Sequence, residues 1–179
     1  TEIYTLSLHD ALPISTSLMY FEKGEVSQNI VHSIKYHNNL RLARRFGQLL
    51  GNSISECHRF DDVDIMVPVP LHFFRWIKRG YNQSRELSEG ISESFKRPVN
   101  NFALARTQYT ETQTHKSHSA RSYNVVNAFK VRHPQRLENK HILLVDDVIT
   151  TGSTIRACYA ALSNVNGVKM SVASIAFAN

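Results

Sequence analysis

The sequence has few of the residues that crosslink small secreted proteins or build zinc sites. Among its 179 residues, the cysteines are Cys57 and Cys158, and no CxxC pair occurs anywhere in the chain. Two cysteines so far apart exclude a disulfide framework and a four-cysteine zinc site, so zinc is not expected in this chain. The seven Gly and five Pro are also too few for a collagen-like or low-complexity chain.

Long hydrophobic runs and targeting signals are missing as well. No apolar run reaches the ~18 residues of a membrane span. The start of the chain does not combine a basic patch, an apolar stretch and a small-residue cleavage site. With 42% hydrophobic and 20% charged residues, the chain can bury a core and is not of disordered composition. These features predict a soluble protein of the cytoplasm.

The first 15 residues, TEIYTLSLHDALPIS, show no hydrophobic period and end in a stretch interrupted by proline. We interpret residues 1–15 as a leader that is not native to the protein. The prediction is therefore a single domain over residues 16–179, a size at which one core is usual.

Positive charge is concentrated in the middle of the chain. The net charge is +6, yet the segment from His72 to Lys140 alone holds 13 Lys and Arg against five Glu, a surplus of eight. Such a field attracts anions, either phosphorylated metabolites or a nucleic-acid backbone. An ordinary solvated basic face is the alternative.

Hydrophobic periodicity predicts two helices and a strand in the first part. Apolar residues recur with a helical period over Val26–Leu50. We expect His37–Asn39 to break this segment into two helices and Gly51 to end the second. The β-branched run Asp64–Pro70 predicts a buried strand.

The remaining elements alternate between helix and strand. A helix is expected from a cap at Asn82 or Ser84 to about Phe95, and the long polar stretch Thr107–Asn124 predicts a functional lid. Strands are predicted over Phe102–Arg106, Asn127–Val131, His141–Val145 and Val168–Ala178, a tight loop over Asp146–Gly152, and a helix over Ser153–Leu162. This alternation predicts an α/β fold with a largely parallel sheet.

The most informative stretch is HILLVDDVITTGST, His141–Thr154. An apolar strand leads to the adjacent carboxylates of Asp146 and Asp147, and in open parallel sheets ligands bind at this end of the strands. Thr150–Thr154 then enter a helix with small side chains, so that backbone N–H groups and the helix N-terminus can surround a phosphate. Carboxylates that accept hydrogen bonds from vicinal hydroxyls, or hold Mg²⁺, complete a site for a phosphorylated sugar.

Two other interpretations of this stretch are weaker. It is not a Walker loop, because the GxxxxGK[ST] pattern is absent. A strand that ends in acidic turn residues before a capped helix is the plainer alternative, and the whole run of strand, DD, TTGST and helix favours a binding site over it.

VDDVITTGST resembles the phosphoribosyl pyrophosphate (PRPP) binding motif of type I phosphoribosyltransferases. Two further segments are similar to segments of the ComF family: VPVPLHFFRWIKRGYNQSREL at Val67–Leu87 and TETQTHKSHSARSYNVVNAF at Thr110–Phe129. With a weaker match at Ile30–Gly51, the resemblance covers roughly residues 20–178. It implies a type I phosphoribosyltransferase-like parallel core sheet flanked by helices, with a small N-terminal hood.

The resemblance also implies a function, the Mg²⁺-dependent transfer of a phosphoribosyl group from PRPP to an acceptor that it does not identify. Asp146 and Asp147 would be the catalytic residues, contact the ribose hydroxyls and hold the Mg²⁺ that accompanies PRPP. The implied substrate-binding residues lie in the phosphate cradle, the pyrophosphate loop and the flap: Val148, Thr150, Thr151, Gly152, Ser153, Thr154, Pro70, Leu71, Arg79, Gly80, Asn82, Gln83, Gln113, Lys116, Arg121 and Asn124.

A second class of function stays open beside this one. The ComF family is tied to DNA uptake in natural competence, so the resemblance also fits a non-catalytic PRPP-sensing protein, or an accessory protein with single-stranded DNA or competence proteins as partners. Phe73, Phe74 and Trp76, set among basic residues, either stack on bases or pack against the sheet edge. We interpret His115 and His118 as solvated loop residues rather than metal ligands.

Two expectations follow from the family alone. Many domains of this fold pair, so a homodimer is an implied partner. Many family members begin with a cysteine-rich zinc-binding segment; either it was lost beneath residues 1–15 or this member lacks it.

Overall fold

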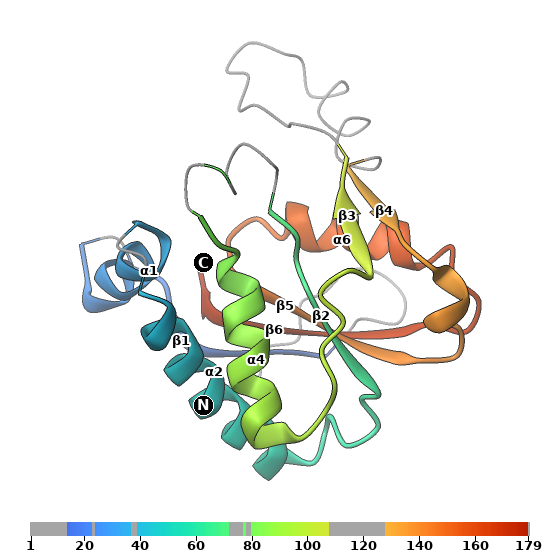
Figure 1. Ribbon diagram of the computed structural model, residues 1–179. Coiled ribbons are helices and arrows are strands. Elements are labelled where there is room, and N and C mark those ends of the chain that lie inside the picture. Colours follow the sequence, from blue (N-terminus) through green and yellow to red (C-terminus); the bar gives the residue numbers. More distant parts are fainter. Residues whose placement is uncertain are drawn as a thin grey trace.

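The computed structural model of the protein describes residues 14–22, 24–36, 39–71, 77, 80–107 and 128–178. Its centre is a four-stranded sheet with the order β1-β6-β5-β2 (Figure 1). The strands are β1 (Ser15–Tyr20), β2 (Ile65–Pro68), β5 (His141–Ile149) and β6 (Lys169–Phe177). All three pairings in this sheet are parallel, which confirms the predicted α/β fold class.

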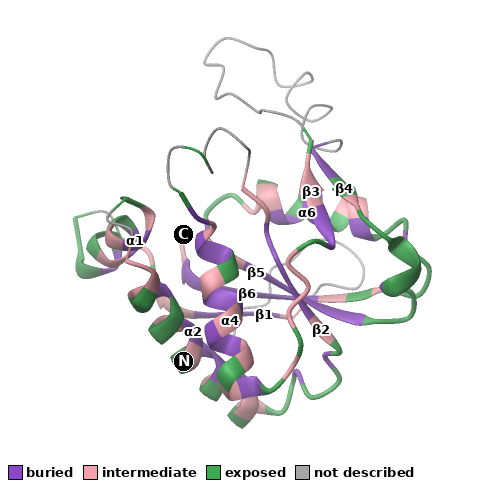
Figure 2. Cartoon of the chain, viewed as in Figure 1, coloured by how far each residue is buried: buried purple, intermediate pink, exposed green. Residues whose placement is uncertain are grey.

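The alternating side chains of β5 divide the core into two layers. Leu143 and Val145 pack with the helices on one face, and Ile142 and Leu144 pack with the elements on the other. This division follows from the strand period of two, which sends successive side chains to opposite faces. In Figure 2 the strands of this sheet are largely buried, as is typical of a parallel sheet covered on both faces.

Helices α1 (Val26–Tyr36), α2 (Leu40–Cys57) and α4 (Gln83–Phe95) belong to the first layer. The predicted break at His37–Asn39 is confirmed, and Asn39 caps α2 by accepting a hydrogen bond from the Leu42 N–H over 3.1 Å. The predicted end of the helix at Gly51 is wrong, because α2 continues to Cys57.

Glycine has a packing role in α2 rather than a terminating one. A Cβ on Gly51 would lie 2.7 Å from the carbonyl oxygen of Ile91, and a Cβ on Gly90 would lie 2.1 Å from the carbonyl oxygen of Arg44. The backbones of α2 and α4 therefore touch at positions where any side chain would separate them. The close contact with α4, and not a turn, therefore requires glycine at position 51.

The second layer holds α6 (Ser153–Leu162) and the short strands β3 (Leu104–Arg106) and β4 (Phe129–Val131). The 3₁₀ turn η1 (Pro134–Arg136) follows β4 and is exposed. The helix over Ser153–Leu162 is confirmed. Strands β3 and β4 are shorter than predicted and form a separate antiparallel pair instead of joining the parallel sheet. The predicted lid between them lies largely outside the described residues.

Two strand boundaries differ from the prediction. Strand β5 does not stop at Val145 but stays paired with β6 as far as Ile149, so Asp146 and Asp147 lie within the strand and not in a loop. The sequence analysis does not predict strand β1, because half of its residues, STSLMY, are polar. This strand pairs with β6, where Ser15 lies opposite Val172. In the part of the chain described here, no helix is both long and apolar enough to cross a membrane.

Candidate functional site

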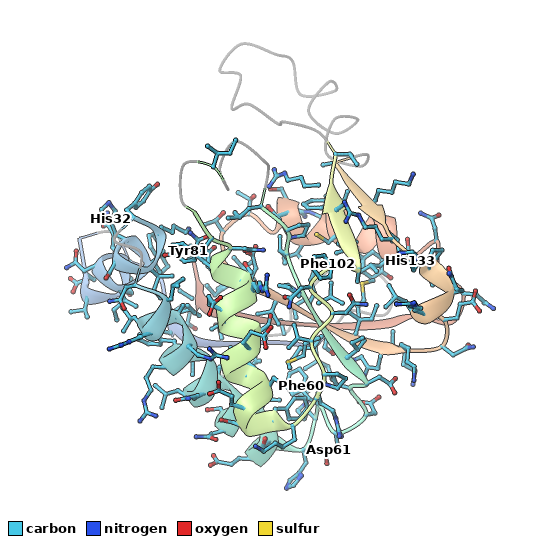
Figure 3. All side chains as sticks on the ribbon, in the orientation of Figure 1. His32, Phe60, Asp61, Tyr81, Phe102 and His133 are labelled. Carbon is cyan, nitrogen blue, oxygen red and sulfur yellow. The ribbon has the colours of Figure 1, made fainter. Side chains whose placement is uncertain are left out.

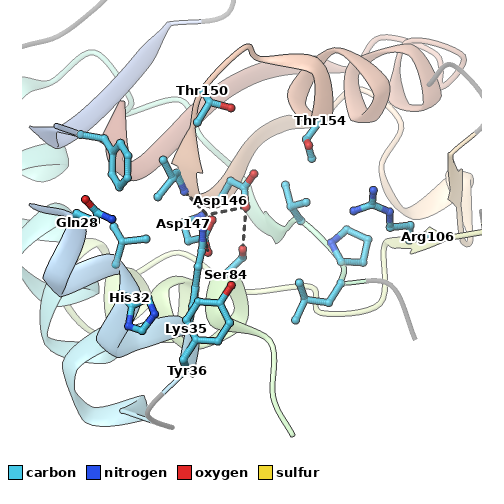
Figure 4. Close-up of a pocket in the computed structure, with 16 residues that line it drawn as sticks. Gln28, His32, Lys35, Tyr36, Ser84, Arg106, Asp146, Asp147, Thr150 and Thr154 are labelled. Carbon is cyan, nitrogen blue, oxygen red and sulfur yellow. Dashed lines mark hydrogen bonds and ion pairs between the residues drawn. The ribbon is translucent and has the colours of Figure 1, made fainter. Parts of the chain in front are cut away.

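A pocket of about 360 Å³ lies at the carboxyl ends of β2 and β5. The segment after β2, the end of β5 and the start of α6 form one side of it, and α1 forms the other (Figure 4). It is lined by Phe21, Gln28, Val31, His32, Lys35, Tyr36, Val69, Pro70, Leu71, Ser84, Arg106, Asp146, Asp147, Val148, Thr150 and Thr154. The site is therefore at the edge of the sheet where parallel strands present ligand-binding groups.

The predicted site residues divide into three groups. Seven of them line this pocket together: Pro70, Leu71, Asp146, Asp147, Val148, Thr150 and Thr154. The second group lies outside the lining, at the start of α6 or beside α4: Thr151, Gly152, Ser153, Gly80, Asn82 and Gln83. The third group lies outside the described residues: Arg79, Gln113, Lys116, Arg121 and Asn124.

Asp146 and Asp147 are held by contacts from three directions. The Ser84 hydroxyl and the Asp147 backbone N–H donate to Oδ1 of Asp146, over 3.1 and 2.9 Å. The Val148 N–H donates to Oδ1 of Asp147 over 2.7 Å, and the Lys35 ammonium lies 3.2 Å from Oδ2 of Asp147. Both carboxylates are thus oriented before any ligand arrives.

The two carboxylates also perturb each other. Burial raises the pKa of the Asp146 carboxyl to about 7 from its ordinary 3.8, and the charge of Asp147 adds to the rise. The Asp147 N–H, the Ser84 hydroxyl and the Lys35 ammonium act in the opposite direction. Burial, the largest cause of this rise, disfavours the charged form of Asp146, so a ligand that brings a cation or hydroxyl donors would stabilise its carboxylate.

The cradle after β5 is built by a left-handed glycine. Gly152 has φ 68° and caps α6, so the chain turns sharply from the strand into the helix. Thr150 and Thr154 line the pocket, while the Thr151 and Ser153 hydroxyls are exposed and bond to each other over 3.1 Å. The first-turn N–H groups of α6 lie at this end of the helix, where its dipole favours an anion.

Asn82 does not line the pocket, but its hydrogen bonds hold residues that do. The Asn82 side chain accepts from the Ser84 N–H over 3.1 Å, which caps α4, and donates to the carbonyl of Val69 over 3.0 Å. Gly80, at φ 77°, supplies the turn before it. Asn82 thereby fixes Ser84 against Asp146 and fixes the end of β2 against α4.

The chain offers no activated thiol at this site. Cys158 is buried, and burial raises the pKa of its thiol, with a further rise from the charge of Asp146. A thiol with a raised pKa stays protonated and is a poor nucleophile.

A Ser–His–Asp arrangement exists at the start of β5, away from the pocket. Nε2 of His141 lies 2.9 Å from the Ser171 hydroxyl, and Nδ1 lies 2.9 Å from Oδ1 of Asp62. Ser171 is 1% exposed, so no substrate can reach its hydroxyl. We therefore assign this arrangement to the stability of the sheet and not to catalysis.

The structure adds residues that sequence reasoning did not place in the site. Arg106 lines the pocket from the end of β3 and lies 5.3 Å from the centre of the Phe129 ring. The sequence predicts Ser84 only as a possible helix cap. Its hydrogen bond to Asp146 is apparent only in the three-dimensional structure. Lys35 lies on α1, and no local sequence pattern pairs it with Asp147.

The donor set fits a magnesium ion that is shared with a substrate. Mg²⁺ prefers carboxylate oxygens and is commonly held by one or two of them together with substrate phosphates. Among residues that the structure describes, no group of three or more His, Cys, Asp or Glu could hold a metal alone. Asp146 and Asp147 could hold such an ion together with phosphate or hydroxyl oxygens of a ligand.

Comparison with known proteins places this chain in a family. Residues 42–179, well over half of the chain, match the phosphoribosyl transferase domain family. The chain belongs to that family.

Its relatives narrow the resemblance further. The chain is 33% identical over 130 residues to Competence protein F of Haemophilus influenzae, a match that covers 70% of this chain and 57% of that protein. It is 33% identical over 129 residues to DNA utilization protein YhgH of Escherichia coli K12, covering 70% and 56%. These matches confirm the ComF resemblance, and the chain spans a little more than half the length of these relatives.

A solved structure shares the fold. Glutamine PRPP amidotransferase from B. subtilis aligns with a TM-score of 0.51 and 17% identity, over 79% of this chain and 30% of that one. At this identity the likeness shows the fold alone.

Proposed function

We propose that this domain binds PRPP together with Mg²⁺ and transfers its phosphoribosyl group to an acceptor. One observation carries the proposal: a carboxylate pair and a hydroxyl-lined helix N-terminus share one pocket. Asp146 and Asp147 take the ribose hydroxyls and the metal ion, and the Thr150–Thr154 turn takes the 5′-phosphate.

The chemistry asks little of the protein beyond position and charge. When pyrophosphate leaves C1 of the ribose, the pair of electrons of that bond goes to the leaving oxygen and the sugar becomes oxocarbenium-like. Carboxylates near the ribose would stabilise that positive charge while a lone pair of the acceptor forms the new bond to C1. A Mg²⁺ ion held by Asp146 and Asp147 would neutralise the departing pyrophosphate. Holding both reactants in one pocket supplies the rest of the rate enhancement.

Calorimetric titration of PRPP, with and without Mg²⁺, tests the proposal. We expect Mg²⁺-dependent binding that Asp146→Asn and Asp147→Asn each weaken about 30-fold, the loss of one charge-assisted hydrogen bond. Asp61→Asn is the matched control, because Asp61 is exposed and pairs with His58 over 3.1 Å. Equal affinity in all four proteins would remove the carboxylate assignment.

A second candidate is a non-catalytic role with single-stranded DNA. It is favoured by the names of the two relatives and by the basic surplus between His72 and Lys140. Salt separates the candidates, since binding to a nucleic-acid backbone weakens steeply as salt rises. An oligonucleotide affinity that falls steeply with salt, without pyrophosphate release in the presence of PRPP, would support this role.

Two broader predictions accompany the proposal. We propose that the protein acts in the cytoplasm, where PRPP is made and used as a soluble metabolite. A homodimer is the oligomeric state to look for in solution.

A further inference from the structure

Helix α1 reaches the site through two neighbouring residues near its end. The Tyr81 hydroxyl donates a hydrogen bond to the carbonyl of Ile34, and the Lys35 ammonium lies 3.2 Å from Oδ2 of Asp147. Tyr81 is followed by Asn82, the cap of α4. The first contact thus joins α1 to the start of α4, and the second joins α1 to β5. Figure 3 shows where Tyr81 lies, just before α4.

The contact with Lys35 completes the fixation of Asp147. One oxygen of that carboxylate accepts from the Val148 N–H over 2.7 Å, and the other faces the ammonium. The side chains of Lys35 and Asp147 are 24% and 15% exposed, so water and salt screen this pair less than a pair on the surface. A carboxylate already held in one orientation loses less freedom when a ligand binds.

The same contact spans the pocket. Lys35 comes from α1 and Asp147 from β5, and both line the cavity (Figure 4). The charge of Lys35 also acts on Asp146, where it opposes the rise in pKa. One side chain of α1 therefore influences both carboxylates at the centre of the site.

We propose that Lys35 is a positioning residue: it fixes the orientation of Asp147 toward the ligand and holds α1 over the pocket. The identity of the ligand rests on the proposed function, whereas the contact itself belongs to the free protein. The competing account is that Lys35 binds the ligand directly and holds nothing in place.

Hydrogen exchange of the free protein separates these accounts through a double-mutant cycle. We expect Lys35→Met and Asp147→Asn each to speed exchange of the α1 amides about fivefold, and the double variant to add nothing further. Lys35→Arg should keep slow exchange, because it restores the charge. Unchanged α1 exchange in Lys35→Met, or additive effects in the double variant, would overturn the proposal.

A titration with PRPP and Mg²⁺ supplies the second readout. Lys35→Met should weaken binding about tenfold, as loss of an outer-shell partner does, and Lys35→Arg should recover most of it. In the Asp147→Asn background Lys35→Met should cost nothing more, and a further loss there would mean direct ligand contact and contradict positioning. If the wild type binds no PRPP, the proposed function fails, and the exchange cycle still decides the role of Lys35.

Discussion

The Ser84 hydroxyl donates a hydrogen bond to Oδ1 of Asp146 over 3.1 Å. This contact joins the first turn of α4 to the end of β5, two segments far apart in the sequence. Asn82 caps the same turn and bonds the carbonyl of Val69, so β2, α4 and β5 are tied together at one corner of the pocket. The orientation of Asp146 therefore depends on α4, which contacts this carboxylate through a neutral hydroxyl and not through a charged side chain.

Removing this hydroxyl should weaken ligand binding without unfolding the protein. We expect Ser84→Ala to lower the PRPP affinity about tenfold, because an outer-shell partner of a ligand-binding carboxylate is lost. Ser94→Ala is the control on the same helix, since that hydroxyl bonds the carbonyl of Gln48 away from the site. Equal calorimetric affinities for the two variants would show that Ser84 does not support the site.

The left-handed conformation of Gly152 gives a second prediction. Gly152→Ala should destabilise the cradle by about 1 kcal/mol, because alanine is strained at φ 68°. Space is not the cause, since no atom lies within 4 Å of an added Cβ. Gly152→Asn should keep both stability and PRPP affinity, because asparagine tolerates this backbone region. Thermal unfolding and calorimetry measure the two effects, and equal losses in both variants would contradict the backbone argument.

Asp64 should contribute stability that depends on pH. Its carboxylate accepts the His141 N–H over 2.8 Å and lies 3.2 Å from the Lys140 ammonium. The His141 hydrogen bond lowers the pKa of Asp64 below its ordinary 3.8, aided by Lys140, although partial burial opposes this. A folded pKa below the unfolded one adds stability above the unfolded pKa, and that stability is lost as pH falls through the folded pKa.

The matching experiment is urea unfolding of Asp64→Asn. At pH 7 the variant should be less stable by no more than about 1 kcal/mol, since Asp64 is well exposed and water screens its charge. The difference should shrink toward zero as pH falls below the ordinary pKa of 3.8 and through the lower pKa of the folded state. A difference that stays constant across this range would mean that the charge of Asp64 is not responsible.

The part of the site that could be predicted from the sequence is the part formed by one continuous segment of the chain. The strand, the two carboxylates, the glycine turn and α6 are contiguous, so local pattern was enough to place Asp146, Asp147 and the Thr150–Thr154 turn together. Lys35, Ser84 and Arg106 come from three other elements. Their positions depend on how α1, α4 and β3 pack, which no local pattern specifies.

The errors in the fold have the same origin. Glycine is common just after a helix, so Gly51 predicts a helix end. In the structure Gly51 packs against α4, and α2 continues to Cys57. Strand β5 extends beyond the apolar run that ends at Val145, because its pairing with β6 continues to Ile149. In both places a partner distant in the sequence overrides the local preference.

The central claim is that the pocket at the end of β5 is a PRPP site, and amide NMR spectra recorded during titration with PRPP and Mg²⁺ test it most directly. We expect the largest shifts at the amides of residues 147–154 and at Ser84, with little change in the distant turn around Gly167. Saturating ligand that leaves residues 147–154 unshifted would contradict the account, whatever changes occur elsewhere in the chain.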